Sequence, residues 1–169
     1  MKIPVNSIFL SGNEKKYLNQ CIKQNWISSG GKFSQLFENN VKKLIKKKFS
    51  ISVTSGTTAL ETAIQALNLK KGDEVILPSF TIISCFNAIV KNGLVPIPVD
   101  CNFEDWNMDI SQIEKKITRK TKAVMVVHIY GLASNIKKII GLKRKYKFKI
   151  IEDASHALGS KYNNKIIGN

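Results

Sequence analysis

A chain of 169 residues, 43% of them hydrophobic, is long enough for one domain with a sizeable hydrophobic core. It has no apolar run of membrane-spanning length and no signal-peptide pattern, which argues against a membrane protein. Cys21, Cys85 and Cys101 contain no C-x-x-C spacing, which argues against a disulfide framework and a structural zinc site and predicts a cytoplasmic protein. The net charge of +15 comes almost entirely from lysine, since only Arg119 and Arg144 are arginines, and this favours a solvated surface over a nucleic-acid site.

The first third of the chain predicts two amphipathic helices, because apolar residues recur there at helical spacing. One apolar face runs over residues 17–22 and a second over 33–44. The dense lysine cluster at 42–48 lies largely off the second face, as expected of a solvated surface. Ile51-Ser52-Val53 follows as a predicted strand.

From about residue 50 onwards, short apolar runs alternate with amphipathic segments. The predicted order is a helix over 60–67, a strand over 74–77 closed by Pro78, a helix over 82–91, a strand over 95–99, a helix over 110–117, a strand over 123–127, a helix from 136 and a strand over 148–151. Pro96 and Pro98 make the strand at 95–99 an edge strand or an irregular one.

Strands separated by helices of this length predict an α/β fold with a mainly parallel sheet and helices on both faces. The continuous apolar run at 123–127 is typical of a strand that is buried on both sides. Ligands of such sheets bind beyond the carboxyl ends of the strands. That rule selects three segments as candidate site loops, 54–58, 79–82 and 152–156.

The first candidate loop, Val53-Thr54-Ser55-Gly56-Thr57-Thr58, follows a predicted strand and opens a helix. Backbone amides at a helix N-terminus, together with small and hydroxyl residues, form a phosphate-binding cradle. An ordinary capped helix is the alternative, because serine and threonine are favoured N-cap residues in any helix. The segment has neither the Walker spacing nor G-x-G-x-x-G.

The last candidate loop places Glu152, Asp153 and His156 just beyond a buried strand. A buried carboxylate needs a partner if it is to stay charged, although a capping aspartate would explain the same pattern. Asp153, Ser155 and His156 are too close in sequence to form a Ser-His-Asp triad. His128 is expected to be a structural hydrogen-bonding residue, and two isolated histidines argue against a metal site.

Taken together, these loops resemble the DegT/DnrJ/StrS family of nucleotide-sugar aminotransferases, and most closely its perosamine-synthase branch. The resemblance is carried by the segments 54–60, 71–81, 127–131 and 151–159, and by the opening segments 10–14 and 26–33. It follows the family's order over essentially the whole chain.

The resemblance implies a fold-type I transferase that binds pyridoxal 5'-phosphate. Gly56 and Thr57 would hold the cofactor phosphate, and Asp153 would pair with the pyridine nitrogen. His156 occupies the position that lies near the phenolic oxygen of the cofactor. Ile82 stands where many members of the family place an aromatic ring stacked on the cofactor, so an aliphatic contact would replace the ring stack.

The resemblance also places the family's Schiff-base lysine beyond Asn169, so no catalytic residue is expected within the chain. Residues 1–169 would then be the N-terminal part of the large cofactor-binding domain, which would be incomplete at its C-terminus and would lack the small C-terminal domain. We therefore expect the chain to be a fragment of a longer enzyme.

The resemblance implies an aminotransferase that moves an amino group from an amino acid, with glutamate as the expected donor, to a nucleotide-linked keto-sugar. The pathway would be that of a cell-surface polysaccharide such as lipopolysaccharide, or of another amino sugar, and the enzyme would be a homodimer. Two alternatives stay open. One is a dehydratase-type member of the same family, and the other is a non-catalytic truncated protein that binds a partner chain or a polyanion.

Overall fold

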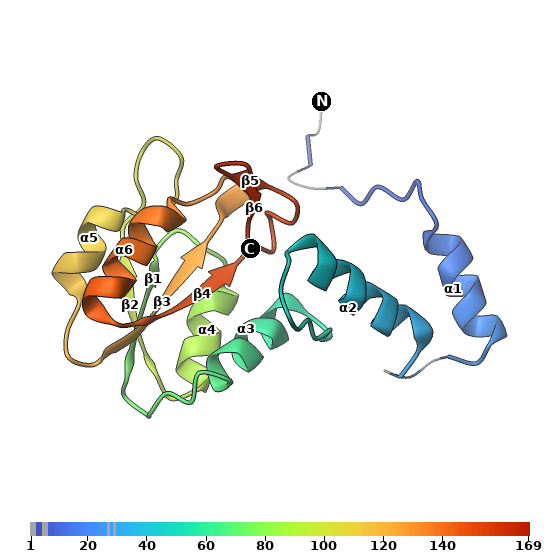
Figure 1. Cartoon of the computed structure of the whole chain (residues 1–169), viewed down its shortest axis with the longest axis horizontal. Helices are drawn as coiled ribbons and strands as arrows, with labels where there is room; N and C mark the ends of the chain where they lie inside the picture. Colours follow the sequence, from blue (N-terminus) through green and yellow to red (C-terminus); the bar gives the residue numbers. More distant parts are fainter. Residues whose placement is uncertain (1–2, 5–6, 27, 29) are drawn as a thin grey trace. The chain divides into compact units, whose positions relative to one another are not determined.

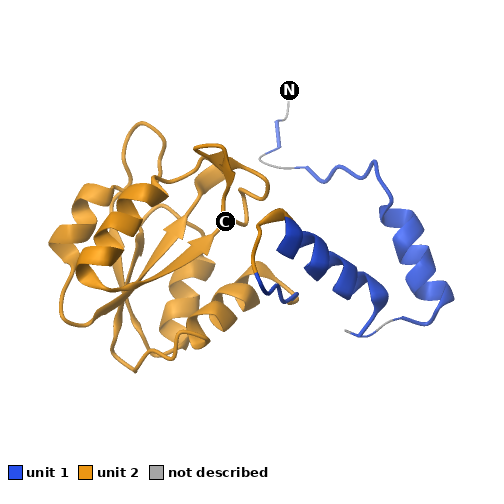
Figure 2. Cartoon of the chain, in the orientation of Figure 1, with its two compact units in different colours: residues 1–43, 48–52 blue, residues 44–47, 53–169 orange. Residues whose placement is uncertain are grey.

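A computed structural model describes residues 3–4, 7–26, 28 and 30–169 of the chain. The chain divides into two compact units, which Figure 2 shows in different colours. Residues 1–43 and 48–52 form the first unit, and residues 44–47 and 53–169 form the second. No helix in the described part of the chain has both the length and the apolar character needed to cross a membrane.

The two predicted helices are α1 (Glu14–Lys23) and α2 (Lys32–Leu44), and both belong to the first unit except for Leu44, the last residue of α2. Tyr17 of α1 and Phe33 of α2 meet with their ring centroids 4.9 Å apart, so the two apolar faces contact each other. No residue described in either helix is fully buried within the protein.

The predicted strand at 51–53 is wrong. These residues belong to no strand, and the Ile51 side chain is 77% exposed. The backbone N–H and the hydroxyl of Ser52 each donate to the Glu38 carboxylate at 2.7 Å. A segment becomes a strand only where a neighbour completes its hydrogen-bond ladder, and here a side chain takes that place.

The second unit follows the predicted alternation, with boundaries displaced by a few residues. Its elements are α3 (Gly56–Gln65), β1 (Glu74–Pro78), α4 (Ile83–Lys91), β2 (Val95–Val99), α5 (Ile110–Lys116), β3 (Thr121–Val127), the 3-10 turn η1 (Ile129–Gly131), α6 (Ile136–Tyr146), β4 (Lys149–Asp153), β5 (Lys161–Tyr162) and β6 (Lys165–Ile166). Ile82, which was predicted to begin a helix, is the N-cap of α4.

The main sheet has the order β2-β1-β3-β4, and all of its pairings are parallel. β2 lies at an edge, which confirms the prediction made from its prolines. Pro96 and Pro98 sit opposite Val75 and Leu77 of β1, and a proline can occupy an edge strand because its missing N–H is not needed on the open side.

The helices cover both faces of this sheet, as predicted (Figure 1). On one face, α3 and α4 pack over a core that includes Val75, Leu77 and Met125. On the other face, α5 and α6 pack over Ile76, Val124 and Val126. Because successive strand side chains point to opposite faces, the apolar run of β3 supplies both cores.

The small antiparallel pair of β5 and β6 was not expected from the sequence. Asn163 and Asn164 connect the two strands with φ values of 49° and 63°. Asparagine tolerates positive φ better than most residues, and two such residues in a row give the tight hairpin turn. The Asn-Asn pair was therefore the available signal for this hairpin.

The two neighbouring isoleucines of α6 provide a test of this packing. Ile139 is fully buried against the sheet, whereas Ile140 is 39% exposed. We expect Ile139→Ala to lower the free energy of unfolding by about 2–5 kcal/mol, and Ile140→Ala to lower it by less than about 1 kcal/mol. Urea unfolding of the purified variants measures both values, and equal losses would contradict the described orientation of α6.

Candidate functional site

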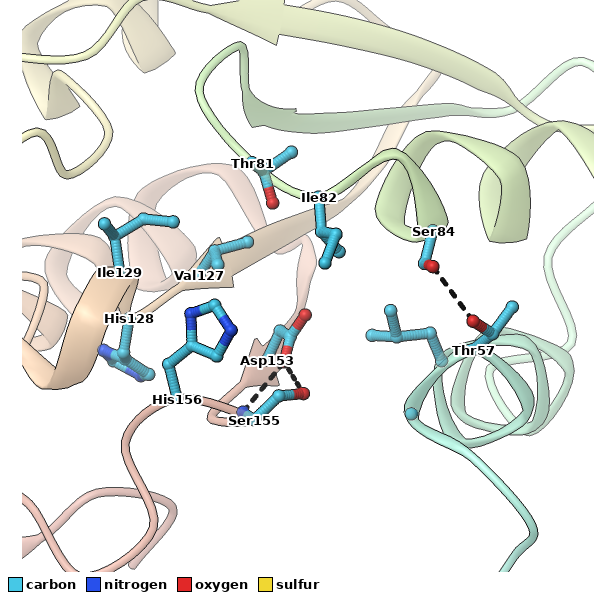
Figure 3. Close-up of a pocket in the computed structure, with 12 residues that line it drawn as sticks. Thr57, Thr81, Ile82, Ser84, Val127, His128, Ile129, Asp153, Ser155 and His156 are labelled. Carbon is cyan, nitrogen blue, oxygen red and sulfur yellow. Dashed lines mark hydrogen bonds between the residues drawn. The ribbon is translucent and has the colours of Figure 1, made fainter. Parts of the chain in front are cut away.

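A cavity of about 230 Å³ lies at the carboxyl ends of β3 and β4 (Figure 3). Its walls come from the starts of α3 and α4 and from the ends of the two strands. The lining residues are Gly56, Thr57, Leu60, Thr81, Ile82, Ser84, Val127, His128, Ile129, Asp153, Ser155 and His156. The fold therefore brings together Gly56, Thr57, Ile82, Asp153 and His156, the five residues that the sequence analysis selected, while their roles stay predictions.

Two helix N-termini meet at this cavity. α3 begins at Gly56 after Ser55, whose side chain accepts a hydrogen bond from the Thr58 N–H at 3.1 Å. α4 begins at Ile83, and its second residue, Ser84, lies 2.9 Å from Thr57 between the two hydroxyl oxygens. Helix N-termini carry unpaired N–H groups and a partial positive charge, so this wall of the cavity favours an anion.

Ser84 is a site residue that the sequence analysis missed. The sequence offered a signal, because a hydroxyl residue stands in the first turn of a helix that directly follows a strand. Only the approach of α4 to α3 shows that this hydroxyl belongs to the same cavity as Thr57.

Asp153 lies on the wall formed by the end of β4, and its side chain is almost fully buried. Its Oδ1 accepts hydrogen bonds from the Ser155 backbone N–H at 3.0 Å and from the Ser155 hydroxyl at 2.5 Å. Its Oδ2 accepts one from the thiol of Cys85 at 3.4 Å. In the described part of the chain no cationic side chain forms an ion pair with Asp153, so its charge is held by neutral donors alone.

The contacts of Asp153 do not form a Ser-His-Asp catalytic triad. Its hydroxyl partner is Ser155, two residues away, and His156 instead stacks on Tyr130. The two rings have centroids 5.6 Å apart and planes inclined by 8°. The exposed His156, which lines the cavity, therefore packs against an aromatic ring and not against Asp153.

The loop after β3 approaches this site closely. Tyr130 adopts φ 47° and Gly131 adopts φ 86°, both in the left-handed region. A Cβ at position 131 would lie 3.4 Å from the backbone oxygen of His156, so glycine suits both the backbone conformation and the limited space. Bulky residues with positive φ are strained, and strain of this kind concentrates at functional sites.

His128 is buried and is hydrogen-bonded at both ring nitrogens. Nδ1 accepts from the Ser134 backbone N–H at 3.1 Å, so the proton of the neutral ring belongs on Nε2. Nε2 lies 3.2 Å from Glu152 Oε2, to which it donates. These contacts confirm the expected hydrogen-bonding role within the fold, and His128 is also among the residues that line the cavity.

The sequence comparison decides the family. The family model of the DegT/DnrJ/EryC1/StrS aminotransferases matches residues 10–169. The chain belongs to this family. Of the opening segment that contributed to the resemblance, Ile27 and Ser29 lie outside the described residues.

Curated relatives and solved structures agree with this assignment. The chain is 44% identical over 166 residues to the GDP-perosamine synthase of Escherichia coli O157:H7, covering 98% of this chain and 46% of that protein. It is 41% identical to the GDP-perosamine synthase of Vibrio cholerae, covering 98% of this chain and 45% of that protein. The chain therefore spans a little less than half the length of these relatives.

Among solved structures, the chain resembles a GDP-4-keto-6-deoxymannose-3-dehydratase with a trapped PLP-glutamate geminal diamine. The TM-score is 0.92 at 26% identity, covering 99% of this chain and 45% of that one. The aminotransferase from Psychrobacter cryohalolentis matches with a TM-score of 0.90 at 28% identity, covering 95% of this chain and 41% of that one. These likenesses confirm the predicted α/β fold class of the family.

The two histidines of the site should behave differently when they are removed. His128→Ala leaves the buried Ser134 N–H without its acceptor, and we expect a loss of about 1–3 kcal/mol from that group alone. His156→Ala removes an exposed ring and should change the free energy of unfolding by no more than about 0.5 kcal/mol. Denaturant unfolding measures both variants, and an equal cost would show that His128 is not the structural member of the pair.

Proposed function

We propose that this chain binds pyridoxal 5'-phosphate and provides the cofactor cavity of an aminotransferase acting on a nucleotide-linked keto-sugar. The observation that carries the proposal is the pairing, within one cavity, of an anion-favouring wall with a buried carboxylate. The relatives support it, because those with 41–44% identity are named GDP-perosamine synthases.

The residues of the cavity suit this cofactor at both of its charged ends. The hydroxyls of Thr57 and Ser84, with the free N–H groups at the starts of α3 and α4, would bind the phosphate. The Asp153 carboxylate, held by three neutral donors, would accept a hydrogen bond from the protonated ring nitrogen. Ile82 and His156 also line the cavity and would border the ring.

When bound, the cofactor supplies an electron-withdrawing ring that stabilises negative charge on the substrate. Asp153 serves this chemistry by keeping a proton on the ring nitrogen. The carboxylate can do so because no lysine or arginine among the described residues pairs with it, and because burial strengthens its attraction to a nearby cation.

Several finer points belong to the same proposal. Residues 1–169 correspond to the N-terminal part of the large domain, the amino donor is glutamate, and the enzyme is a homodimer. The substrate is a nucleotide-linked keto-sugar of the kind used for perosamine and related polysaccharide sugars. Support for the substrate class comes from the GDP-perosamine synthases and from a dTDP-3-amino-3,6-dideoxy-alpha-D-galactopyranose transaminase at 38% identity.

A dehydratase is the second candidate, because a solved dehydratase shares the fold with a TM-score of 0.92. The curated relatives of higher identity favour the aminotransferase, since 44% exceeds 26%. Product analysis separates the two reactions. An aminotransferase leaves nitrogen on the sugar, whereas a dehydratase leaves a deoxygenated sugar without nitrogen.

The phosphate cradle predicts which part of the cofactor dominates binding. We expect pyridoxamine 5'-phosphate to bind the chain about 100-fold more tightly than pyridoxamine, because the phosphate contributes several charge-assisted hydrogen bonds. Thr57→Val removes one of these donors and should weaken binding of the phosphate form about tenfold. Isothermal titration calorimetry measures these affinities.

Thr62→Val is the matched control for this experiment. Thr62 lies on the same helix, but its hydroxyl donates to the backbone oxygen of Thr58 and does not border the cavity. Its replacement should leave cofactor affinity unchanged. Equal affinities for pyridoxamine 5'-phosphate and pyridoxamine would contradict the proposed phosphate cradle.

Asp153→Asn tests the other end of the cavity. In a protein that extends this chain to the length of its relatives, we expect transamination to fall by at least about 100-fold, because an amide lacks the negative charge that keeps the ring nitrogen protonated. The secondary structure seen by circular dichroism should not change. Asp109→Asn, at the N-cap of α5, is the control, and unchanged turnover in Asp153→Asn would refute the assignment.

A further inference from the structure

We propose that Cys85 is a positioning residue that holds the Asp153 carboxylate in the orientation needed by the cofactor ring. The inference rests on the proposed function, but it concerns a contact that exists within the chain without any ligand. Cys85 does not line the cavity, and its thiol is fully buried beneath the cavity wall.

The contact joins a helix and a strand end that are 68 residues apart in the sequence. Cys85 lies in the first turn of α4, after β1, and Asp153 ends β4, with β3 between the two strands in the sheet. The Thr81 hydroxyl donates to Cys85 Sγ at 3.2 Å, and Cys85 Sγ donates to Asp153 Oδ2 at 3.4 Å. Hydrogen bonds thus lead from the cavity wall at Thr81 through the thiol to the carboxylate.

The thiol stays protonated and is therefore a donor at neutral pH. Burial raises the pKa of Cys85 to about 11, and the negative charge of Asp153 acts in the same direction, while the hydrogen bond from Thr81 opposes them. Because Thr81 donates to the sulfur, the single S–H proton is free to point at Oδ2.

A neutral donor has an advantage over a cation at this position. Ser155 holds Oδ1 with two hydrogen bonds, and the Cys85 thiol holds Oδ2, so the carboxylate is restrained at both oxygens. A lysine or arginine would restrain it equally well but would neutralise its charge. The thiol orients the carboxylate and leaves the negative charge available for a protonated ring nitrogen.

Cys85 also belongs to the hydrophobic core beneath α3 and α4, so simple packing is the competing explanation. Two variants separate the explanations. Cys85→Ser keeps a donor but places a more polar group in the core, whereas Cys85→Ala removes the donor and keeps the site apolar. If Cys85 only packs, cofactor binding in Cys85→Ser should be no better than in Cys85→Ala. If it positions Asp153, cofactor binding in Cys85→Ser should be close to that of the native chain.

The first measurement needs no cofactor. In the purified chain with ¹³Cβ-labelled cysteine, an NMR titration gives the pKa of Cys85, and Asp153→Asn should lower that pKa because it removes a neighbouring negative charge. Cys101, in the same unit but outside the cavity, is the internal control and should titrate unchanged. An unchanged Cys85 pKa in Asp153→Asn would overturn the inference, whatever the protein's function.

The second measurement uses ¹⁵N-labelled pyridoxamine 5'-phosphate, whose ring-nitrogen chemical shift reports protonation. We expect a protonated ring in the native chain and in Cys85→Ser and Cys101→Ala, and a partly deprotonated ring with about tenfold weaker binding in Cys85→Ala. Identical spectra and affinities in Cys85→Ala and the native chain would overturn the positioning role. Failure of the native chain to bind the probe would count against the proposed function, and the cofactor-free titration would still decide the Cys85–Asp153 contact.

Discussion

The parallel pairing of β3 with both β1 and β4 is the constraint on which the rest of the second unit depends. Parallel strands require crossover helices, and those helices must cover the sheet, which is why β3 is apolar on both faces. Parallel pairing also brings every carboxyl end to the same edge. The loops after β1, β3 and β4, together with the start of α3, therefore meet at one cavity, although they are up to about a hundred residues apart in the chain.

Among the described residues, neutral donors and helix N-termini, and no lysine or arginine paired with Asp153, shape the electrostatics of this cavity. One wall of the cavity offers N–H groups and hydroxyls at two helix N-termini, and another wall offers the buried Asp153 carboxylate. Serine and cysteine side chains and one backbone N–H hold that carboxylate. Such an arrangement would suit the proposed ligand, which carries a phosphate at one end and a protonated ring nitrogen at the other.

The relatives show that this framework supports more than one reaction. A dehydratase and an aminotransferase share the fold with TM-scores of 0.92 and 0.90, so the backbone arrangement alone does not select between them. The described residues place two helix N-termini and a buried carboxylate at one cavity, and the proposed binding of a phosphate and a ring nitrogen rests on that arrangement. In this chain, Gly131 adopts φ 86° and lets the loop after β3 approach the backbone of His156.

The sequence by itself predicted the α/β class, the edge position of β2 and the three loops that supply the candidate site. Periodicity reports burial, and proline at Pro96 and Pro98 reports a missing ladder partner, so these properties are local. The sequence did not determine that 51–53 lacks a partner strand, that Ser84 reaches Thr57, or that Cys85 contacts Asp153. Each of these depends on which segments become neighbours in space. The shared cavity wall and the Cys85–Asp153 hydrogen bond exist only once β1, β3 and β4 have paired.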